Sequence, residues 1–485
     1  MHEVELRRRP IGALSSVLPD SQAAALEAAV HRAARALDGR VVWQVSSVAT
    51  GGGIAEMLHG LLGYFLDAGV RMRWLVIDAD ERFFVITKRL HNAIHGVPGK
   101  FTEADHRHYQ EILSCNALAI NPGDIVMLHD PQTAGLACQL RPSGVRVAWR
   151  SHIGRDTPND VSISAWEFLR RYIDEADAFV FSRALFAPPW IDRRKLAIIP
   201  PSIDPLSAKN RPLHDPAAIL ARAGLPTAPR LVVQVSRWDR LKDMPGVMTG
   251  FRLADLPADV HLVLAGPAVR GVADDPEGAE VFAQCHAIRA KLLADIRSRI
   301  HLVSIPMDDA GHNATIVNAL QRHATILVQK SLAEGFGLTV AEGMWKTKPV
   351  IASAVGGIQD QIMAERTGLL LSDPADPAEF AAALRRLLAD DVLARRLGEA
   401  AHARVLHRYL DDRQLIQTAT LLESLAGPQP GPVQPEPVLT QNLPRARTPS
   451  MTESLTATQP DRFPQPDRSL PNMTDSPSLT AASPT

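Results

Sequence analysis

The chain of 485 residues has little cysteine and no excess of charge of either sign. Its three cysteines, Cys115, Cys138 and Cys285, stand far apart, without a Cys-x-x-Cys or His/Cys cluster, which excludes a disulfide framework and a structural zinc site. Fifty-two Lys and Arg residues against 53 Asp and Glu leave a net charge of -1, which excludes a general attraction to nucleic acid or an anionic membrane. Any phosphate must therefore be bound by a local group of residues.

Long apolar runs are also missing. The N-terminus, MHEVELRRRP, lacks the apolar segment of a secretory signal, and no stretch reaches the roughly 20 apolar residues of a membrane span. We therefore expect a cytoplasmic protein with reduced, buried thiols. With 46% hydrophobic and 22% charged residues the composition is that of a globular protein, and the length predicts two or more domains.

Short apolar runs rich in β-branched residues alternate with longer helical patterns, and this alternation occurs twice along the chain. The runs begin at Val41, Arg73, Asp124, Val145, Ala178 and Leu196 in the first part, and at Leu231, His261, Ile300, Ala324 and Lys348 in the second. Such alternation predicts parallel sheets built from βαβ units. The expected fold class is α/β, with two doubly wound, Rossmann-like domains whose strand ends line a shared central cleft.

The periodicity is interrupted over residues 202–215, which we interpret as a connection between domains. We expect an N-terminal domain over 1–204, a second domain over 205–405 and a C-terminal helix over 406–426. Residues 427–485 carry 13 of the 37 prolines, with many Ser, Thr and Gln and few large apolar residues. This composition predicts a disordered tail without a catalytic role.

Three consecutive glycines, Gly51, Gly52 and Gly53, follow the first expected strand and precede a helix. Without side chains there, an anionic ligand can approach backbone N–H groups and the positive end of the helix dipole. A tight turn without a ligand is the alternative. An NAD site is disfavoured, because the third glycine of Gly-x-Gly-x-x-Gly falls on Glu56, whose bulk and charge oppose a pyrophosphate.

Asp78 and Asp80 form an Asp-x-Asp tripeptide at the end of an expected strand. Two such carboxylates can bind Mg²⁺ or Mn²⁺, but no other ligand set is evident. We favour the simpler interpretation of acidic residues at a helix entry, which need no metal.

The segment VSRWDRLKD follows the first strand of the second part and supplies Arg237 and Lys242, with Arg240 between them. Arginine offers a planar fork that matches phosphate oxygens, and lysine offers a mobile charge, so together they can neutralise a diphosphate without metal. A solvated basic turn is the alternative.

The segment EGFGLTVAE places two carboxylates, Glu334 and Glu342, on either side of a glycine-rich helix start. The helix start binds anions, and Glu342 lies about 7 Å further along the helix. Carboxylates repel phosphate, so they suit hydroxyl groups on either side of it. A molecule with hydroxyls, a diphosphate and further hydroxyls is a nucleotide sugar. Two surface glutamates at a helix start are the alternative.

With Arg237 and Lys242 upstream and VGGI downstream, this pair of glutamates resembles the retaining glycosyltransferases of the GT-B fold. Further segments resemble the trehalose synthases, which join nucleotide-glucose to glucose. They are GGGIAEML, IDADERFFVITKRLHNAIHG, LHDPQTAGL, WRSHIG, VNALQR and QKSLAEGFGLTVAEGMWKTKPVIASAVGGI. The resemblance extends from Val41 to Gly368 and excludes the tail.

The resemblance implies a donor site in which Arg237 and Lys242 contact the diphosphate, Glu334 the transferred sugar and Glu342 the nucleotide ribose. Further residues would approach the sugar and phosphates with backbone amides: Gly335, Phe336, Gly337, Leu338, Gly356 and Gly357, and Gly51, Gly52 and Gly53 from the opposite domain.

On the acceptor side, the resemblance implies that His152 lies near the donor sugar and the reaction centre. His129, Asp130 and Gln132 would line the acceptor. Similar trehalose-forming sequences tend to carry an acid where this chain has Gly154, so the acceptor, and with it the product, is left open.

The resemblance also implies a mechanism of front-face attack, in which the departing phosphate helps to deprotonate the acceptor hydroxyl. The substrates would be a nucleotide-diphosphate-glucose and a sugar acceptor, without a cofactor or metal, and a homodimer is possible. Three alternatives remain: a trehalose phosphorylase that uses glucose 1-phosphate, a glycosyltransferase with another acceptor, and a nucleotide-sugar-binding protein without turnover.

Overall fold

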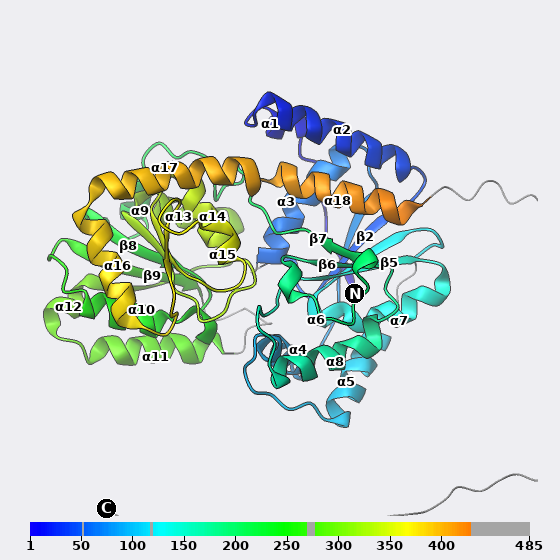
Figure 1. Cartoon of the computed structure of the whole chain (residues 1–485), viewed down its shortest axis with the longest axis horizontal. Coiled ribbons are helices and arrows are strands. Elements are labelled where there is room, and N and C mark those ends of the chain that lie inside the picture. Colours follow the sequence, from blue (N-terminus) through cyan, green and yellow to red (C-terminus); the bar gives the residue numbers. More distant parts are fainter. Residues whose placement is uncertain (51–52, 117–119, 269–276, 428–485) are drawn as a thin grey trace, which may run out of the picture. The chain divides into compact units, whose positions relative to one another are not determined.

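The computed structural model describes residues 1–50, 53–116, 120–268 and 277–427, and all of these residues belong to one compact unit. Two sheets follow each other along the chain (Figure 1). We call the part built on the first sheet the N-terminal lobe and the part built on the second sheet the C-terminal lobe. Gly51, Gly52 and the predicted disordered tail beyond Gly427 lie outside the described residues.

The first sheet has seven strands in the order β1-β3-β2-β4-β5-β6-β7. They are β1 (His2–Glu3), β2 (Val42–Ser46), β3 (Met72–Val76), β4 (Ile125–His129), β5 (Arg146–Ser151), β6 (Ala178–Phe181) and β7 (Leu196–Ile198). All neighbours are parallel except β1 and β3. The strand order reverses between β2 and β4, and a doubly wound sheet forms its ligand crevice at such a reversal.

The second sheet has six parallel strands in the order β10-β9-β8-β11-β12-β13. They are β8 (Arg230–Val235), β9 (Val260–Pro267), β10 (Ile300–Ile305), β11 (Ile326–Gln329), β12 (Val350–Ser353) and β13 (Leu369–Leu371). Its order reverses between β8 and β11. The crevice of this lobe is therefore expected where these two strands end.

Many helices begin at a polar residue whose side chain accepts a backbone N–H, such as Asp80, Asn159 and Asp309. The helices are α1 (Ile11–Ser15), α2 (Asp20–Ala36), α3 (Gly53–Asp67), α4 (Glu81–Ile94), α5 (Glu103–Ser114), α6 (Asp130–Thr133), α7 (Ala137–Leu140), α8 (Asp160–Ile173), α9 (Pro216–Arg222), α10 (Met244–Leu253), α11 (Gly278–Ala290), α12 (Ala294–Arg299), α13 (Ala310–His323), α14 (Leu338–Trp345), α15 (Ile358–Gln361), α16 (Pro377–Ala389), α17 (Asp391–Arg408) and α18 (Asp411–Ala426). Short 3₁₀ helices are η1 (Ala134–Leu136), η2 (Arg141–Ser143), η3 (Ala184–Phe186), η4 (Arg193–Lys195) and η5 (Arg240–Lys242).

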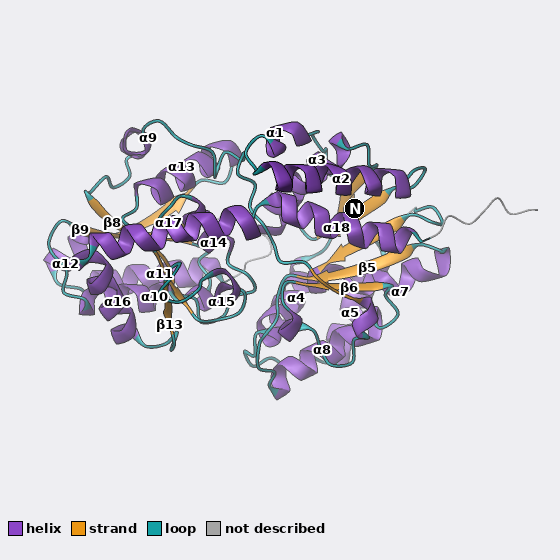
Figure 2. Cartoon of the chain, turned by 45° about the horizontal axis from the view of Figure 1, so that its top comes forward, coloured by secondary structure: helices purple, strands orange, loops and turns teal. Residues whose placement is uncertain are grey.

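Helices cover both faces of each sheet (Figure 2). Val42 packs with residues of α2, α3 and α18, whereas its neighbour Trp43 packs on the opposite face with residues of α4, α5 and α8. The first of these cores continues into the C-terminal lobe through α13, α14 and α17, and α10, α11 and α16 cover the other face of the second sheet. The two lobes therefore share one apolar core.

The predicted connection over residues 202–215 is a loop between the two lobes. Ile203 forms an isolated bridge with Leu410, between α17 and α18, and its N–H donates to the Tyr409 carbonyl at 2.9 Å. The chain thus passes between the lobes twice at one place, and α18 returns to pack on α2 and α3. The domain boundaries stay predictions, and α17 runs through residue 405 to Arg408.

The fold confirms the predicted α/β class, and each of the eleven predicted strands matches one from β2 to β12. The sequence did not indicate β1 and β13, which have two and three residues and are too short to show a period.

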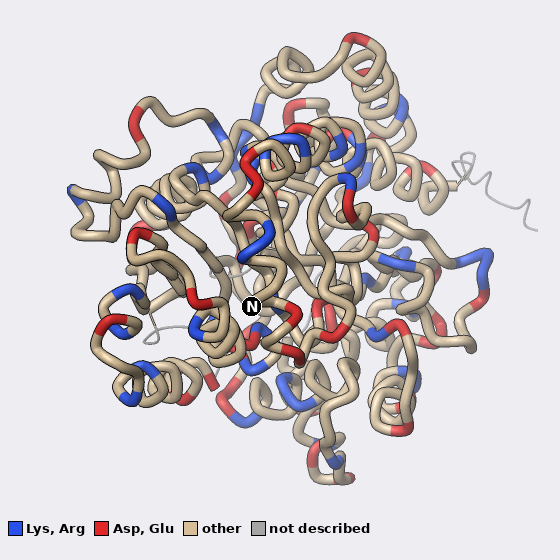
Figure 3. The backbone as a smooth tube through the Cα atoms, turned by 60° about the vertical axis from the view of Figure 1, so that its left-hand side comes forward, with Lys and Arg blue, Asp and Glu red and all other residues tan. Residues whose placement is uncertain are grey.

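Charged positions of both signs are interspersed along the tube (Figure 3). Within the described part of the chain, no helix is both long and apolar enough to span a bilayer.

Candidate functional site

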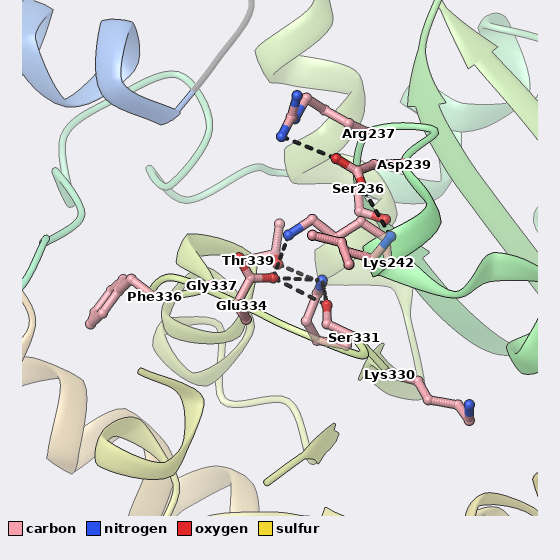
Figure 4. A network of polar contacts seen from close by, with 12 residues as sticks. Ser236, Arg237, Asp239, Lys242, Lys330, Ser331, Glu334, Phe336, Gly337 and Thr339 are labelled. Atoms are coloured by element: carbon pink, nitrogen blue, oxygen red, sulfur yellow. Dashed lines mark hydrogen bonds and ion pairs between the residues drawn. The ribbon is translucent and has the colours of Figure 1, made fainter. Parts of the chain in front are cut away.

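The ends of β8 and β11, where the second sheet reverses its order, bring together three of the predicted donor-site residues. Arg237 and Lys242 follow β8 and Glu334 follows β11. Lys242 Nζ lies 2.6 Å from Glu334 Oε2, which also accepts from Ser331 Oγ at 3.1 Å and from Gln329 Nε2 at 3.4 Å (Figure 4). The cation and the carboxylate predicted to share a nucleotide sugar are therefore in direct contact.

Asp239 holds the turn that carries these cations. Its Oδ1 accepts the Leu241 N–H at 2.8 Å and so caps η5, which ends at Lys242. Its Oδ2 lies 3.4 Å from Nη2 of Arg237. Asp239 was not among the predicted site residues, although an Asp directly before a turn is a capping signal.

Glycines permit three backbone segments to meet beside Glu334. Gly337 has a φ of 85° and directly precedes α14, as predicted for this helix start. A Cβ on Gly335 would collide with the carbonyl oxygen of His152 in the N-terminal lobe. Gly356 has a φ of 48°, and the Gly357 N–H donates to the Gly335 carbonyl at 3.2 Å. The predicted glycines therefore lie together, but their contacts with a donor stay predictions.

The side chains next to these glycines belong to the core. Phe336 points away from the polar network (Figure 4) and lies with its ring centroid 5.7 Å from that of Tyr409, so only its backbone can face a donor. Leu338 begins α14 and Gly53 begins α3. A Cβ on Gly53 would lie 2.9 Å from Leu338 Cδ1, so the starts of these two helices lie close together, while the contact of Gly53 with a donor stays a prediction.

Glu342 is buried, with 1% of its surface exposed, and its carboxylate is already engaged. It accepts from Gln321 Nε2 at 2.6 Å and lies 3.4 Å from Lys209 Nζ. Burial alone would raise its pKa, but the charges of Lys209 and Lys346 hold the pKa below its ordinary value. The cavity beside it, about 30 Å³, has room for only about two water molecules. A ribose reaches Glu342 only if Lys209 moves, and this role stays a prediction.

Lys209 connects this carboxylate to the N-terminal lobe, because it also pairs with Glu56 of α3. Glu56, whose bulk and charge disfavour a dinucleotide site, therefore has a structural ion-pair partner in Lys209. Lys209 and Gln321 gave no sequence signal, since each lies more than 20 positions from the group it contacts.

His129 and His152 form a stacked pair at the ends of the neighbouring strands β4 and β5. His129 Nδ1 lies 3.1 Å from His152 Nε2, and His129 Nε2 lies 2.8 Å from Gln44 Oε1. Burial and the charge of Arg150 lower the pKa of His129 to about 3 and that of His152 well below its usual range. Both rings are therefore neutral at pH 7. Because Gln44 Oε1 only accepts, His129 Nδ1 accepts from His152 Nε2–H.

The predicted acceptor residues lie around this pair. Asp130 has a φ of 60° and accepts the His152 N–H at 2.7 Å, while burial raises its pKa to about 7. Gln132 is half-buried in α6. A Cβ on Gly154 would collide with the ring of Phe186, so this aromatic ring fills the space in which an acidic side chain would begin. Their contacts with an acceptor stay predictions.

Both carboxylates of the Asp-x-Asp tripeptide have structural partners. Asp80 caps α4 by accepting the Phe83 N–H at 2.7 Å, and Asp78 pairs with the N-terminal amine. Among the described residues no group of three or more His, Cys, Asp or Glu side chains is placed to bind a metal. The expectation of metal independence itself stays a prediction.

Comparisons with known proteins identify the family of the chain. The family "Trehalose synthase, N-terminal domain" matches residues 44–188, and the family "Glycosyl transferases group 1" matches residues 217–404. The trehalose synthase of Pyrococcus horikoshii is 35% identical over 404 residues, which cover 82% of this chain and 93% of that protein. The trehalose synthase of Rubrobacter xylanophilus is 36% identical over 405 residues, which cover 81% and 92%.

Solved structures show the same fold. The UDP-forming α,α-trehalose-phosphate synthase of Burkholderia vietnamiensis matches with a TM-score of 0.62 and 17% identity, over 80% of this chain and 97% of that one. The chain therefore belongs to the trehalose synthase family of GT-B glycosyltransferases.

Proposed function

We propose that the protein is a retaining glycosyltransferase that moves glucose from a nucleotide-diphosphate-glucose to glucose and so forms trehalose. The contact between Lys242 and Glu334, with Arg237 beside them at the reversal of the second sheet, supports this most directly. A diphosphate needs cations, and sugar hydroxyls need a strong acceptor, and both occur here side by side. Family membership supports the choice of glucose as donor sugar and acceptor.

When the donor binds, Lys242 turns from Glu334 to the diphosphate, and Arg237 provides a second cation with a planar fork. Glu334 then accepts hydrogen bonds from hydroxyls of the glucose. When Lys242 moves away from Glu334, its ammonium group becomes available to the diphosphate and the Glu334 carboxylate becomes available to the sugar. Binding of one donor molecule therefore uses both groups. These two cations neutralise the negative charge of the departing phosphate, so that no metal ion is needed for this.

The acceptor hydroxyl attacks on the face from which the nucleotide leaves. Its oxygen bonds to C1 as the bond from C1 to the phosphate oxygen breaks, and its proton passes to that phosphate oxygen. The products are trehalose and a nucleoside diphosphate. Neutral His152 donates from Nε2 to His129, so its Nδ1 accepts a hydrogen bond from a substrate hydroxyl and orients it.

The proposal is tested by NMR of a reaction that contains the protein, glucose and a mixture of UDP-, ADP- and GDP-glucose. An α,α-linked non-reducing disaccharide with release of one nucleotide supports it and identifies the donor. Nucleotide release without this disaccharide would contradict glucose as the acceptor, and Gly154 would be the first residue to vary. Formation of glucose 1-phosphate from trehalose and inorganic phosphate, without use of any nucleotide sugar, would identify a phosphorylase instead.

A further inference from the structure

Helix α4 of the N-terminal lobe presents a polar face to the cations of the C-terminal lobe. Lys88, His91 and His95 are three and four positions apart, so they lie on one side of the helix. The rings of His91 and His95 are 5.0 Å apart between centroids. Burial and the nearby charge of Lys242 lower the pKa of His95 to about 4, so it is neutral at pH 7. Lys88 is the charged member of this face.

Lys88 makes ion pairs across the two lobes. Its Nζ lies 3.1 Å from Asp239 Oδ2 and 3.1 Å from Glu277 Oε1, both in the C-terminal lobe. Only 9% of the Lys88 side chain is exposed. An ammonium group buried to this degree is retained only with close charge partners, which these two carboxylates provide.

The carboxylate of Asp239 is shared between cations of the two lobes. Oδ2 contacts Lys88 Nζ at 3.1 Å and Arg237 Nη2 at 3.4 Å, while Oδ1 is held by the Leu241 N–H. Burial alone would raise the pKa of Asp239, but the charges of Lys88, Arg237 and Lys242 hold it far below its ordinary value. Asp239 is therefore a buried anion held next to Arg237, the cation that we assign to the diphosphate.

Such an anion competes with a diphosphate for Arg237. If Lys88 were absent, Asp239 would lose an ammonium partner that lies 3.1 Å away, and its attraction for Arg237 would increase. Arg237, whose Nη2 now lies 3.4 Å from Asp239 Oδ2, would be drawn into a closer ion pair with this carboxylate. The diphosphate would then have to break that pair, which lowers its affinity.

We propose that Lys88 is a positioning residue of the donor site, which neutralises Asp239 from the opposite lobe and thereby keeps Arg237 directed to the diphosphate. This inference rests on the proposed function only in taking a diphosphate as the ligand. It also makes the approach of the two lobes part of diphosphate binding, because Lys88 and Asp239 belong to different lobes.

The test is a double-mutant cycle read by calorimetry with ADP, UDP and GDP as ligands. Lys88→Met is expected to weaken binding of the preferred nucleotide by about tenfold or more, through the uncompensated charge of Asp239. In the Asp239→Asn background, adding Lys88→Met should change Kd by less than about twofold, because the asparagine oxygen still caps η5 but carries no charge. Arg82→Met, in the first turn of α4, is the matched control and should leave Kd unchanged.

Two outcomes would overturn the inference. An equal loss of affinity in both backgrounds would make Lys88 a direct ligand of the phosphate, and an unchanged Kd in Lys88→Met would leave it a structural contact between lobes. If Lys88→Met does not fold, Lys88→Gln, which keeps a polar end group and loses the charge, is compared in the same way. If the unsubstituted protein binds none of the three nucleotides, the proposed function fails, whatever the variants do.

Discussion

At the scale of single residues, the acceptor side depends on two histidines that carry no charge. His129 and His152 lie on adjacent strand ends, and burial together with the guanidinium of Arg150 keeps both neutral. In this neutral pair Gln44 sets the direction, with His152 Nε2–H donating to His129 Nδ1, and protonation of His129 would remove that acceptor. The arrangement therefore fixes which nitrogen of His152 faces the substrate.

This neutrality makes stability depend on pH. The pKa of His129 is about 3 in the fold and near 6.5 in the unfolded chain, so the unfolded state binds more protons between these values. Its contribution to stability is complete above about pH 6.5 and is lost as the pH falls toward 3. The pKa of Asp130 is raised to about 7, so its contribution to stability changes with pH in the opposite direction. Asp130 is present in both proteins of the comparison below, so its effect is the same in each.

The comparison is between the unsubstituted protein and His129→Gln. The free energy of unfolding, measured by urea between pH 7 and pH 5, should fall more steeply for the unsubstituted protein. The difference in slope should approach one proton, or about 1.4 kcal/mol per pH unit. Parallel profiles would mean that His129 is charged in the fold.

The Phe186 ring occupies the space beside Gly154, the position at which the resemblance led us to expect an acid. Gly154→Ala should lower the free energy of unfolding by about 1–3 kcal/mol, because the new methyl group overlaps the Phe186 ring. Phe186→Leu in the same chain should recover part of that loss. Thermal unfolding of the two single variants and the double variant measures this coupling, and additive losses would show that the two positions do not compete for space.

The residue types of the candidate donor site could be predicted from the sequence, but the side chains that form ion pairs with them could not. Arg237, Lys242 and Glu334 stand in short segments whose chemistry suits a nucleotide sugar. Lys88 and Lys209 act through ion pairs with residues far away in the sequence, and only the fold brings such groups together.

At the scale of elements, the entry to α14 is a close contact between the two lobes. Gly335 lies against the backbone of His152, where no side chain fits. Gly335→Ala should move the two segments apart and lower kcat/KM by about 10²-fold, since a shift of about 1 Å at a reacting centre has effects of this size. Gly12→Ala, in α1 with open space around it, is the control and should keep kcat/KM unchanged. Equal rates in both variants would contradict the close approach.

Strands were predictable because buried parallel strands form short apolar runs. A separate C-terminal helix was expected from residue 406, but the exact place of the break, between Arg408 and Asp411, was not predictable because HRYLDDRQ contains no Gly or Pro. The helix ends there for a tertiary reason: Tyr409 and Leu410 pair with Ile203, and Asp411 accepts from Ser202 Oγ at 2.6 Å. Contacts with a distant segment do not appear in a local pattern.

At the scale of the whole molecule, the two lobes are joined by a shared core, by α18 and by the pairs that Lys88 and Lys209 make. The tail beyond Gly427 contributes few apolar residues by its sequence. A chain that ends at Gly427 should therefore keep the kcat/KM and the Tm of the full chain. A loss of either would assign the tail a role in the enzyme.

We propose that Arg237 and Lys242 bind the diphosphate and stabilise it as it departs. The most direct measurement is kcat/KM with the preferred nucleotide-glucose for Arg237→Ala and Lys242→Ala. Arg240→Ala serves as the control, because this arginine stands in the same turn but is 59% exposed and pairs with Glu280. We expect kcat/KM to fall by about 10²- to 10³-fold in the first two variants and to stay unchanged in the control. Rates near those of the unsubstituted protein in all three variants would contradict it.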